Sequence, residues 1–471
     1  MNLKKHIPIF QLIASIGLTI SLLISTWLPS WFLVVGLILS AIFAFLSFTR
    51  LRFGIKLLQI GLSVVIALSL LYAQQSLSRL LNSEKTETTI LDFYVKKGST
   101  LESLEETSQL TFGISEQVEK EVHTQLSGNL ESLSPQAKWA FSLSEQELFT
   151  QLMSGEIDVW VVDNSLMETL LEWDPDLLDK VTLIYSTEES FVKPDISKDV
   201  DTSKETFIIL LSGIDTSGPI RARSRSDVNI LLVVNPNSYE VLTVSIPRDS
   251  YVDLACKNNA KDKLTHAGVY GVDCSVSSIE QLFDIDINYY VKVNFTSFLK
   301  VVDVVGPINV YSQFTFTTTK YVSYFKSYTF KAGMNQMNAE QALFFSRERH
   351  AFVNSDVQRG LNQQQVIKGL INKLIEPSTL TKIDRIIKTT ASAIDTNLTS
   401  TQLNELIKLQ LEKNPSWSFN SNYLKGKSDY QPTYSMGSRL LFVYWPEATS
   451  VKEIHDQIET IKSHTKPEIV D

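Results

Sequence analysis

The sequence predicts an α/β protein that folds beyond a membrane anchor. Three observations support this: apolar runs fill residues 1–80, short strands alternate with helices over residues 90–190, and apolar strands alternate with amphipathic helices over residues 206–465. At 471 residues the chain is too long for one ordinary domain. We therefore expect a three-helix membrane anchor, a small α/β accessory domain and a larger α/β domain.

The expected anchor consists of three apolar runs, Ile7–Leu28, Trp31–Thr49 and Phe53–Gln74. Each is long enough to cross a hydrocarbon core of ~30 Å at a rise of ~1.5 Å per residue. Two further runs follow the first at once, which favours a multi-pass anchor over a cleaved signal peptide.

Positive charge near these runs predicts their orientation. Lys4 and Lys5 precede the first run. Arg50 and Arg52 lie between the second and third runs, whereas the connection at Pro29 is uncharged. Because basic loops stay in the cytoplasm, the amino terminus is expected inside and everything after about residue 80 outside the cell.

The part beyond the anchor is acidic. Residues 1–80 hold six of the 43 basic side chains and no acidic one. The rest of the chain therefore holds 37 basic and 52 acidic side chains, a net charge of −15. Such a field does not attract polyphosphate or nucleic acid, so no nucleic-acid partner is expected. Any affinity for phosphate has to come from a local cluster.

The two cysteines, Cys256 and Cys274, lie close in sequence and away from any histidine pair, which excludes a zinc site. Outside a cell, a disulfide closing this short loop would be stable. Two unpaired thiols are the alternative.

The region over residues 90–190 predicts a small α/β domain. Strands are expected at Asp158–Asp163 and Val181–Tyr185, with a helix at Leu166–Trp173 between them. The sequence of this region indicates no chemistry.

The region over residues 206–465 begins with three apolar strands, Phe207–Leu211, Val228–Val234 and Val241–Ile246. Apolar runs this continuous are typical of strands that helices cover on both faces. The sequence therefore predicts an α-β-α sandwich. Its expected helices are Ser277–Phe283, Phe295–Val304, Ala339–Arg349, Asn362–Ile375 and Ser400–Leu411.

Acidic residues flank these strands at one edge of the expected sheet. If the first two strands form an antiparallel hairpin, Asp215 and Asp227 meet there. The third strand would return Arg248 and Asp249 to the same edge. Two carboxylates with nearby hydroxyls suit Mg²⁺ or Mn²⁺, so Asp215 and Asp227 are the candidate metal ligands.

Arginines cluster around this edge. Of nine arginines after residue 80, seven fall in three short stretches. A guanidinium group binds phosphate bidentately and stays charged beside others, so the clusters predict a phosphate site. For each arginine alone, an ion pair with a neighbouring carboxylate is the simpler interpretation. The clustered residues are Arg221, Arg223, Arg225, Arg248, Arg347, Arg349 and Arg359.

Conventional nucleophile motifs are missing from the sequence. There is no Gly-x-Ser-x-Gly elbow and no Gly-rich loop ending in Lys-Ser/Thr. This argues against a covalent hydrolase and against an NTPase.

Seven short segments, in order over about residues 206–375, resemble the LytR–CpsA–Psr (LCP) family in its streptococcal capsule-protein CpsA form. Met436–Pro446 also resembles the closing strand of that family. Two positions depart from the pattern: Ser346 replaces a common Ala, and Asn362 replaces a frequent second arginine, which puts one phosphate contact in doubt. The segments are Gly213–Asp215, Arg225–Asp227, Ser245–Asp249, Val293–Phe295, Asp303–Pro307, Ser346–Arg349 and Asp356–Gln365.

The resemblance implies an enzyme, a phosphotransferase that moves a glycopolymer from undecaprenyl pyrophosphate to peptidoglycan; capsular polysaccharide is the expected polymer. The expected partners are the lipid-linked polysaccharide, peptidoglycan, the membrane and other capsule biosynthesis proteins. A long apolar groove would hold the isoprenoid tail, with helices near Phe295–Val304 and Val366–Ile375 as candidate walls.

In this interpretation, a divalent cation held by Asp215 and Asp227 would bridge the diphosphate, and arginines would neutralise the leaving lipid phosphate. Asp227 or Asp249 would orient the attacking hydroxyl. The expected pyrophosphate ligands are Arg225, Arg248, Arg347, Arg349, Arg359 and Gln363, and the expected catalytic residues are Asp227, Arg248, Asp249 and Arg347.

Three other functions remain compatible with the sequence. A lipid-pyrophosphate hydrolase would use water in place of the sugar. A non-catalytic scaffold or sensor of capsule synthesis could act through residues 90–190. A membrane-bound transcriptional regulator is disfavoured, because the large acidic part is expected outside the cell.

Overall fold

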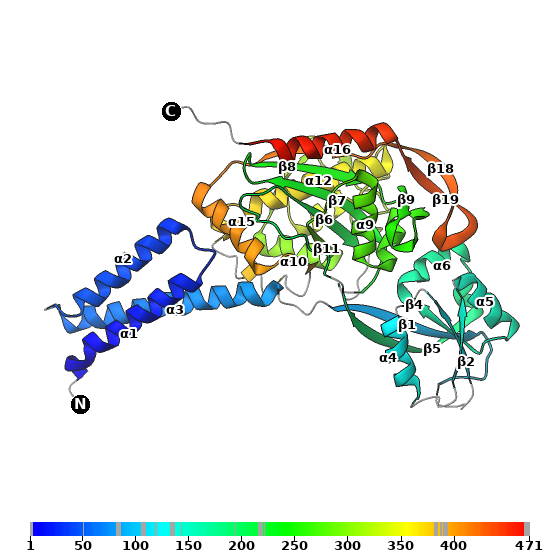
Figure 1. Ribbon diagram of the computed structural model, residues 1–471. Coiled ribbons are helices and arrows are strands. Elements are labelled where there is room, and N and C mark those ends of the chain that lie inside the picture. The colour runs from blue at the N-terminus through cyan, green and yellow to red at the C-terminus, as the bar shows by residue number, and fades with distance from the viewer. Residues whose placement is uncertain are drawn as a thin grey trace.

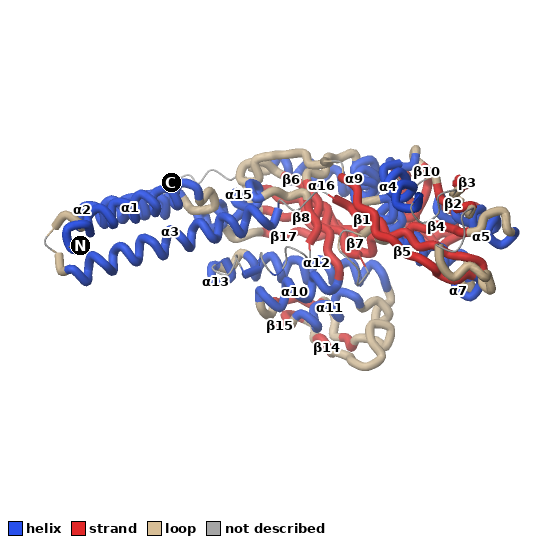
Figure 2. Tube along the Cα trace, turned by 90° about the horizontal axis from the view of Figure 1, so that it is seen from below, coloured by secondary structure: helices blue, strands red, loops and turns tan. Residues whose placement is uncertain are grey.

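The computed structural model describes residues 3–49, 51–81, 86–104, 110–116, 118, 120–131, 137–142, 144–193, 195–214, 220, 222–380, 385–386, 389 and 394–465. A bundle of three helices extends from one side of a larger α/β unit, and a smaller α/β unit lies on another side (Figures 1 and 2).

The bundle consists of α1 (Leu3–Ile24), α2 (Ser30–Leu46) and α3 (Phe53–Leu81), and α1 packs against both others. Within the described residues, two segments are long and apolar enough to cross a membrane, His6–Ile24 and Phe53–Gln75. The prediction of three such spans is therefore corrected to two, because α2 has only 17 residues, ~26 Å at ~1.5 Å per residue.

Polar groups end α2 earlier than its sequence predicts. The hydroxyls of Ser47 and Thr49 donate to carbonyls of the last turn, Ala44 O and Leu46 O. The ammonium of Lys56 then donates to Ser47 O and Thr49 O at 2.6 and 2.7 Å. Side-chain donors that satisfy the last carbonyls of a helix end it, because no further helical N–H groups are needed there. The apolar run of the sequence therefore extends beyond the end of α2.

The smaller unit is a five-stranded sheet in the order β3-β2-β4-β1-β5. The predicted strand and helix at residues 158–173 are present as β4 and α6, and the strand from Val181 continues to Val192. Its elements are β1 (Thr86–Lys96), β2 (Thr111–Ser115), α4 (Lys120–Glu131), β3 (Lys138–Ser142), α5 (Glu145–Ser154), β4 (Val159–Asp163), α6 (Met167–Trp173), α7 (Leu177–Lys180) and β5 (Val181–Val192).

The larger unit contains a six-stranded sheet in the order β16-β11-β6-β7-β8-β17. β6, β7 and β8 form the predicted up-and-down path through antiparallel pairs, whereas β11 and β17 pair in parallel with β6 and β8. The strands are β6 (Phe207–Ile214), β7 (Ser226–Asn235), β8 (Glu240–Ile246), β11 (Tyr289–Asn294), β16 (Ile394–Thr396) and β17 (Ser418–Tyr423).

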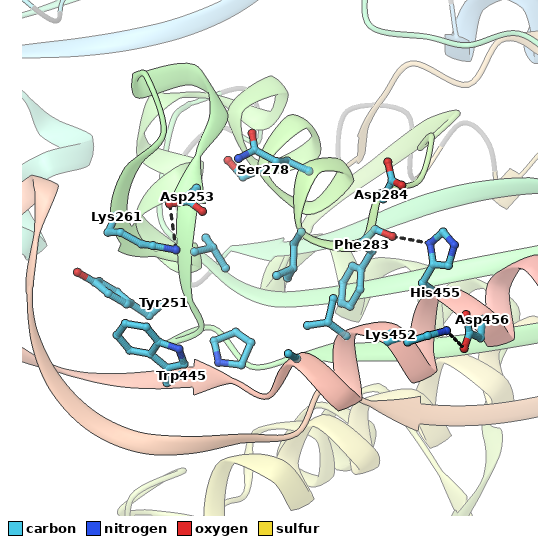
Figure 3. Close-up of a pocket in the computed structure, with 16 residues that line it drawn as sticks. Tyr251, Asp253, Lys261, Ser278, Phe283, Asp284, Trp445, Lys452, His455 and Asp456 are labelled. Carbon is cyan, nitrogen blue, oxygen red and sulfur yellow. Dashed lines mark hydrogen bonds and ion pairs between the residues drawn. The ribbon is translucent and has the colours of Figure 1, made fainter.

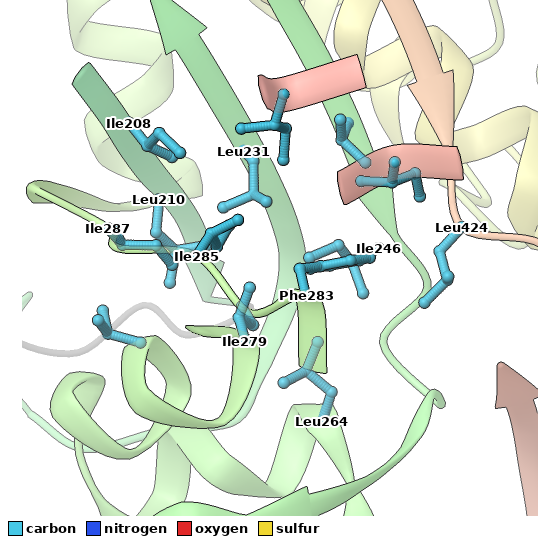
Figure 4. Packing of buried hydrophobic residues seen from close by; sticks show 14 of the residues in the cluster. Ile208, Leu210, Leu231, Ile246, Leu264, Ile279, Phe283, Ile285, Ile287 and Leu424 are labelled. Atoms are coloured by element: carbon cyan, nitrogen blue, oxygen red, sulfur yellow. The ribbon is translucent and has the colours of Figure 1, made fainter. Parts of the chain in front are cut away.

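Helices cover both faces of this sheet, as the apolar strands predict; every residue of β8 after Glu240 is buried. On one face Ile279 and Phe283 pack against Leu210 and Leu231 (Figure 4). The helices are α8 (Leu264–Ala267), α9 (Val272–Phe283) and α16 (Ala448–Ser463) on that face, and α10 (Phe295–Val305), α11 (Ala339–Arg347), α12 (Ser355–Leu374), α13 (Pro377–Leu380) and α15 (Ser400–Lys413) on the other side.

Four short hairpins surround the sandwich. The predicted closing strand does not join the main sheet, because β19 pairs along its length with β18. Cys256 and Cys274 form a disulfide between the β9–β10 hairpin and α9. The hairpin strands are β9 (Tyr251–Leu254), β10 (Ala260–Lys263), β12 (Ile308–Ser312), β13 (Phe316–Thr317), β14 (Thr329–Phe330), β15 (Gly333–Met337), β18 (Gly426–Thr433) and β19 (Gly437–Pro446).

Candidate phosphate-binding site

One edge of the main sheet gathers charged residues from two strand connections. Ile214 at the end of β6 lies opposite Ser226 at the start of β7, and β8 returns to this edge. Arg248 Nη1 donates to Asp227 Oδ1 at 2.9 Å. The predicted meeting of Asp227, Arg248 and Asp249 is confirmed, because short connections leave antiparallel neighbours no other arrangement. Asp215 and Arg221 lie outside the described residues.

Two helices bring further arginines to the same place. Asn338 caps α11 through a capping box, and α11 ends at Arg347. Arg349 follows two residues later, and α12 carries Arg359 and Gln363.

These residues line a cavity of about 240 Å³. Four guanidinium groups and one carboxylate, that of Asp227, make its lining strongly positive. The structure thus brings together six of the predicted site residues. The lining residues are Asp227, Val228, Arg248, Phe295, Tyr321, Val322, Arg347, Arg349, His350, Arg359 and Gln363.

The arginines in this cavity are only partly compensated. Burial lowers the pKa of Arg359, and Arg248 and Arg349 act in the same direction, although Asp356 Oδ1 lies 2.6 Å from Arg359 Nη2. Burial also acts to lower the pKa of Arg248, but the carboxylates of Asp227 and Asp249 outweigh it and raise that pKa. An anion in the cavity would relieve the repulsion between the guanidinium groups.

Arg248 also keeps one donor available. Its Nε atom is buried and forms no hydrogen bond within the described part of the chain. The nearby oxygen of Asp249, Oδ2, is 3.7 Å away. A buried donor without a partner is costly, so this nitrogen suits a ligand oxygen.

Asp249 does not line the cavity but supports its edge. Its Oδ1 atom lies 3.2 Å from Lys263 Nζ at the end of β10. Asp249 therefore sits between two cations, Arg248 and Lys263, and the geometry gives it a role in holding Arg248.

Arg225, a predicted pyrophosphate ligand, points away from this cavity. Its Nη2 atom lies 2.6 Å from Glu168 Oε2 and its Nη1 atom donates to Glu172 Oε1 at 2.5 Å. Both glutamates belong to α6 of the smaller unit. Arg223 likewise contacts that unit, through Glu87 Oε2 at 3.2 Å. No pattern in the sequence indicated that the smaller unit docks here.

Sequence reasoning missed two aromatic residues of the cavity, Tyr321 and His350, whose rings lie 4.2 Å apart. Glu348 holds the segments that carry them: it is fully buried and accepts hydrogen bonds from Thr319 N at 2.5 Å and Ala351 N at 3.0 Å. The only signal in the sequence was the position of Glu348 between Arg347 and Arg349. Asn362 is buried and donates to Phe345 O, which gives it a packing role.

An apolar passage continues from the charged cavity. A cavity of about 90 Å³ shares Val228, Phe295, Arg347 and Gln363 with it. A larger cavity of about 400 Å³ follows between the sheet and its covering helices, and shares Leu211, Val293, Phe298 and Ile367 with the small one. α10 and α12 form walls, as predicted.

The boundary between polar and apolar parts lies at Phe295. The guanidinium carbon of Arg347 sits 4.2 Å from the centre of the Phe295 ring. One side of this pair faces the arginine cavity and the other faces the small apolar cavity. The arrangement suits a molecule with an anionic head and a long hydrocarbon tail.

Among the described residues, no group of three His, Cys, Asp or Glu side chains could hold a metal ion. Asp227 is the one described carboxylate in the charged cavity, and its Oδ1 atom also contacts the Thr265 hydroxyl at 3.4 Å. Mg²⁺ commonly binds one or two carboxylates and takes its other ligands from phosphate and water, so Asp227 would supply one such carboxylate beside a bound phosphate.

The sequence of the larger unit matches a known family. The model of the LytR_cpsA_psr family covers residues 181–456, more than half of the chain. The chain belongs to the LytR–CpsA–Psr family. The match includes every described residue of the charged cavity and of the apolar passage.

Curated relatives in this family are polyisoprenyl-teichoic acid–peptidoglycan teichoic acid transferases named TagU. The one from Bacillus cereus is 34% identical over 214 residues, 45% of this chain and 67% of its own length. The one from Bacillus licheniformis is 35% identical over 208 residues, 44% of this chain and 64% of its own length. The chain thus spans about two thirds of these LytR–CpsA–Psr relatives.

Solved structures of LytR–CpsA–Psr proteins are also similar. A structure of TagT bound to LIIa-WTA is 26% identical, covers 57% of this chain and 94% of its own, and has a TM-score of 0.45. The crystal structure of B. subtilis TagU is 28% identical, covers 56% of this chain and 100% of its own, and has a TM-score of 0.43.

Proposed function

We propose that this protein is a phosphotransferase that moves a glycopolymer, capsular polysaccharide in particular, from a polyprenyl pyrophosphate carrier to peptidoglycan. The observation that carries the proposal is the continuity of an arginine-lined cavity with an apolar passage. The first fits a diphosphate and the second fits an isoprenoid tail. The names of the relatives, transferases from polyisoprenyl carriers to peptidoglycan, support the same reaction class.

In the proposed reaction, a hydroxyl oxygen of a wall sugar attacks the phosphorus that carries the glycan. The new P–O bond replaces the bond to the lipid-linked phosphate, which leaves as polyprenyl phosphate, and the hydroxyl proton is released. Negative charge grows on the leaving phosphate. Arg347, Arg349 and Arg359 would bind and neutralise that charge, because preorganised cations in a buried site cost no reorganisation during the reaction.

Two aspartates have separate proposed tasks. Asp227 faces the cavity and would orient the attacking hydroxyl, while Asp249 would fix Arg248 from behind. Asp227 would also hold Mg²⁺ or Mn²⁺, with Asp215 as the second ligand expected from the sequence. Such an ion supplies charge neutralisation between the two phosphates when it is bound.

Contacts between the anchor and α15 support an extracellular placement of the larger unit. Ser30 donates from its amide and its hydroxyl to Glu412 Oε1, both at 2.7 Å. Asn404 Nδ2 donates to Thr26 Oγ1 at 2.9 Å, and Trp27 packs against the same helix. The α1–α2 connection therefore lies beside the larger unit, while the α2–α3 connection lies at the far end of the bundle (Figure 2).

With the amino terminus in the cytoplasm, α1 would bring the α1–α2 connection to the outer surface, and the larger unit lies beside that connection. Both α/β units would then be extracellular, the smaller one as an accessory domain. α15 also lines the large apolar cavity through Leu406 and Gln410. The open end of the lipid passage would thus face the membrane surface.

Transfer by the full-length protein in liposomes tests the proposal. Given lipid-linked glycan, Mg²⁺ and wall fragments, the wild type should attach glycan to the wall. Arg248→Ala and Arg347→Ala should each lower the rate about 100-fold or more, and Arg385→Ala, an exposed arginine outside the cavity, should not. Release of free glycan phosphate instead of wall-linked glycan would reveal a hydrolase and reject the transferase.

A further inference from the structure

A separate cavity lies on the opposite face of the main sheet from the apolar passage. It is an open groove of about 620 Å³ between β9, the end of α9, the end of β19 and the start of α16 (Figure 3). Its size falls within the ~300–1,000 Å³ typical of small-molecule sites. None of its lining residues belongs to the charged cavity or to the apolar passage.

Two aromatic rings form one end of this groove. The rings of Tyr251 and Trp445 lie 5.1 Å apart, tilted by 47° (Figure 3). Tyr251 is buried and fixed, because its hydroxyl donates to Pro432 O at 2.7 Å. Trp445 is 43% exposed. The groove therefore presents a rigidly backed indole face, and the C–H face of a sugar ring packs well on such a surface.

Polar side chains surround the remaining rim. Asp253 and Lys261 pair at 2.9 Å beside the aromatic end, and Asp284, His455 and Asp456 lie at the other end (Figure 3). They offer hydrogen-bond donors and acceptors at several points, as a ligand with many hydroxyl groups requires.

The charges of the groove do not suit phosphate. Three carboxylates, Asp253, Asp284 and Asp456, face the two ammonium groups of Lys261 and Lys452, and none of the described arginines lines the groove. The charged cavity has the opposite balance, with four arginines and one aspartate. The charged cavity and the groove therefore favour different parts of a glycolipid substrate or of its acceptor. The groove favours an uncharged, polyhydroxylated part.

The groove also lies next to the reaction edge. Tyr444 N donates to Asp249 O at 2.8 Å, and Trp445 follows directly. β9 begins at Tyr251, three residues after Arg248, and its partner β10 ends at Lys263, which pairs with Asp249. The hairpin thus forms a wall of the groove, and its end with Tyr251 and Lys263 adjoins Asp249, which contacts Arg248 of the charged cavity.

We propose that this groove binds an uncharged segment of a glycan chain, with Trp445 stacked on one sugar ring. Its role in catalysis, holding either the donor polymer or the wall acceptor beside the pyrophosphate site, rests on the proposed transferase function. Glycan binding itself does not depend on that function.

Calorimetric titration of the full-length protein in detergent tests the inference with two probes. One is a β-1,4-linked N-acetylglucosamine oligomer, an uncharged stand-in for the wall glycan; the other is polysaccharide cut from its lipid. At least one should bind, and Trp445→Ala should raise its Kd about tenfold or more, as loss of an aromatic anchor does. Trp445→Phe should keep most of the affinity. The probe that binds identifies donor or acceptor.

Tyr430→Ala is the matched control. Tyr430 lies on the β18–β19 hairpin, which also carries Trp445, and is 62% exposed but outside the groove. This variant should bind glycan like the wild type. The inference is overturned if neither probe binds, if Trp445→Ala binds normally, or if Tyr430→Ala is equally impaired. Polyprenyl pyrophosphate binding, measured in parallel, should be normal in Trp445→Ala. If the wild type binds glycan but not polyprenyl pyrophosphate, the transferase function is rejected and the glycan-binding site is retained.

Discussion

The guanidinium group of Arg225 is held at 2.5 Å by Glu172, a residue 53 positions earlier in the chain and in helix α6 of the smaller α/β unit. Glu168 of the same helix lies 2.6 Å from the other terminal nitrogen. Burial acts to lower the pKa of Arg225, but these carboxylates outweigh it and raise that pKa. The pair links the smaller α/β unit to the strand edge that carries Asp227.

Breaking this link should destabilise the protein. Glu172→Gln leaves the largely buried Arg225 with one partner, and we expect a loss of about 1–3 kcal/mol, less than for a fully buried pair because Glu172 is partly exposed. Thermal unfolding measures the loss. Combining Glu172→Gln with Arg225→Met gives a double-mutant cycle, and a coupling energy near zero would show that the contact contributes nothing.

The apolar passage should select for the lipid tail. Ile367 lines both apolar cavities, so Ile367→Trp would fill the junction between them. We expect the Kd for a long polyprenyl pyrophosphate to rise about tenfold or more. A short-chain pyrophosphate, which needs only the arginines, should bind as before. Val353→Trp, at a fully exposed position outside the cavities, is the control. Equal loss for both ligands would contradict the assignment of the passage.

The contact between the anchor and α15 should matter only for substrate in a bilayer. Glu412→Ala removes both hydrogen bonds from Ser30 and frees the helix that lines the open end of the lipid passage. KM for substrate embedded in liposomes should rise about threefold to tenfold, since each hydrogen bond to a charged group contributes ~1.5–3 kcal/mol at most. KM for detergent-dispersed substrate should not change. Lys413→Ala, at the exposed neighbouring position, should resemble the wild type with both substrates.

Glu145 should make the smaller unit sensitive to pH. Burial raises the pKa of its carboxyl from 4.5 to about 8, although Trp160 Nε1 donates to it at 2.8 Å. A raised pKa means that the folded state keeps a proton which the unfolded state releases. This contribution is fully present below pH 4.5 and is lost as the pH rises through 8.

Measuring the free energy of unfolding from pH 4.5 to 9 tests this expectation. For a pKa shift of this size, the free energy should fall by about 5 kcal/mol across that range. Glu145→Gln cannot release the proton, so the stability difference between it and the wild type should grow with pH across that window. Glu156→Gln, an exposed change in the same unit, should run parallel to the wild type. A pH-independent difference for Glu145→Gln would refute the prediction.

The sequence alone determined which residues meet at the sheet edge. Asp227 and Arg248 are joined by two antiparallel strands with a short turn, so their meeting follows from local connectivity. Arg347 and Arg349 could be placed because a capped amphipathic helix leads directly to them. The continuous apolar strands likewise predicted a sandwich, since buried faces have to be covered.

Only the tertiary structure decided the partner of Arg225, the end of α2 and the groove beside Trp445. Each depends on surfaces that separately folded segments present to one another. Glu172 reaches Arg225 because helix α6 of the smaller unit docks against the larger unit, and Lys56 reaches the end of α2 from the following helix. Periodicity and short loops encode neighbours along the chain. Contacts between distant segments depend on how their finished surfaces fit, which no local pattern records.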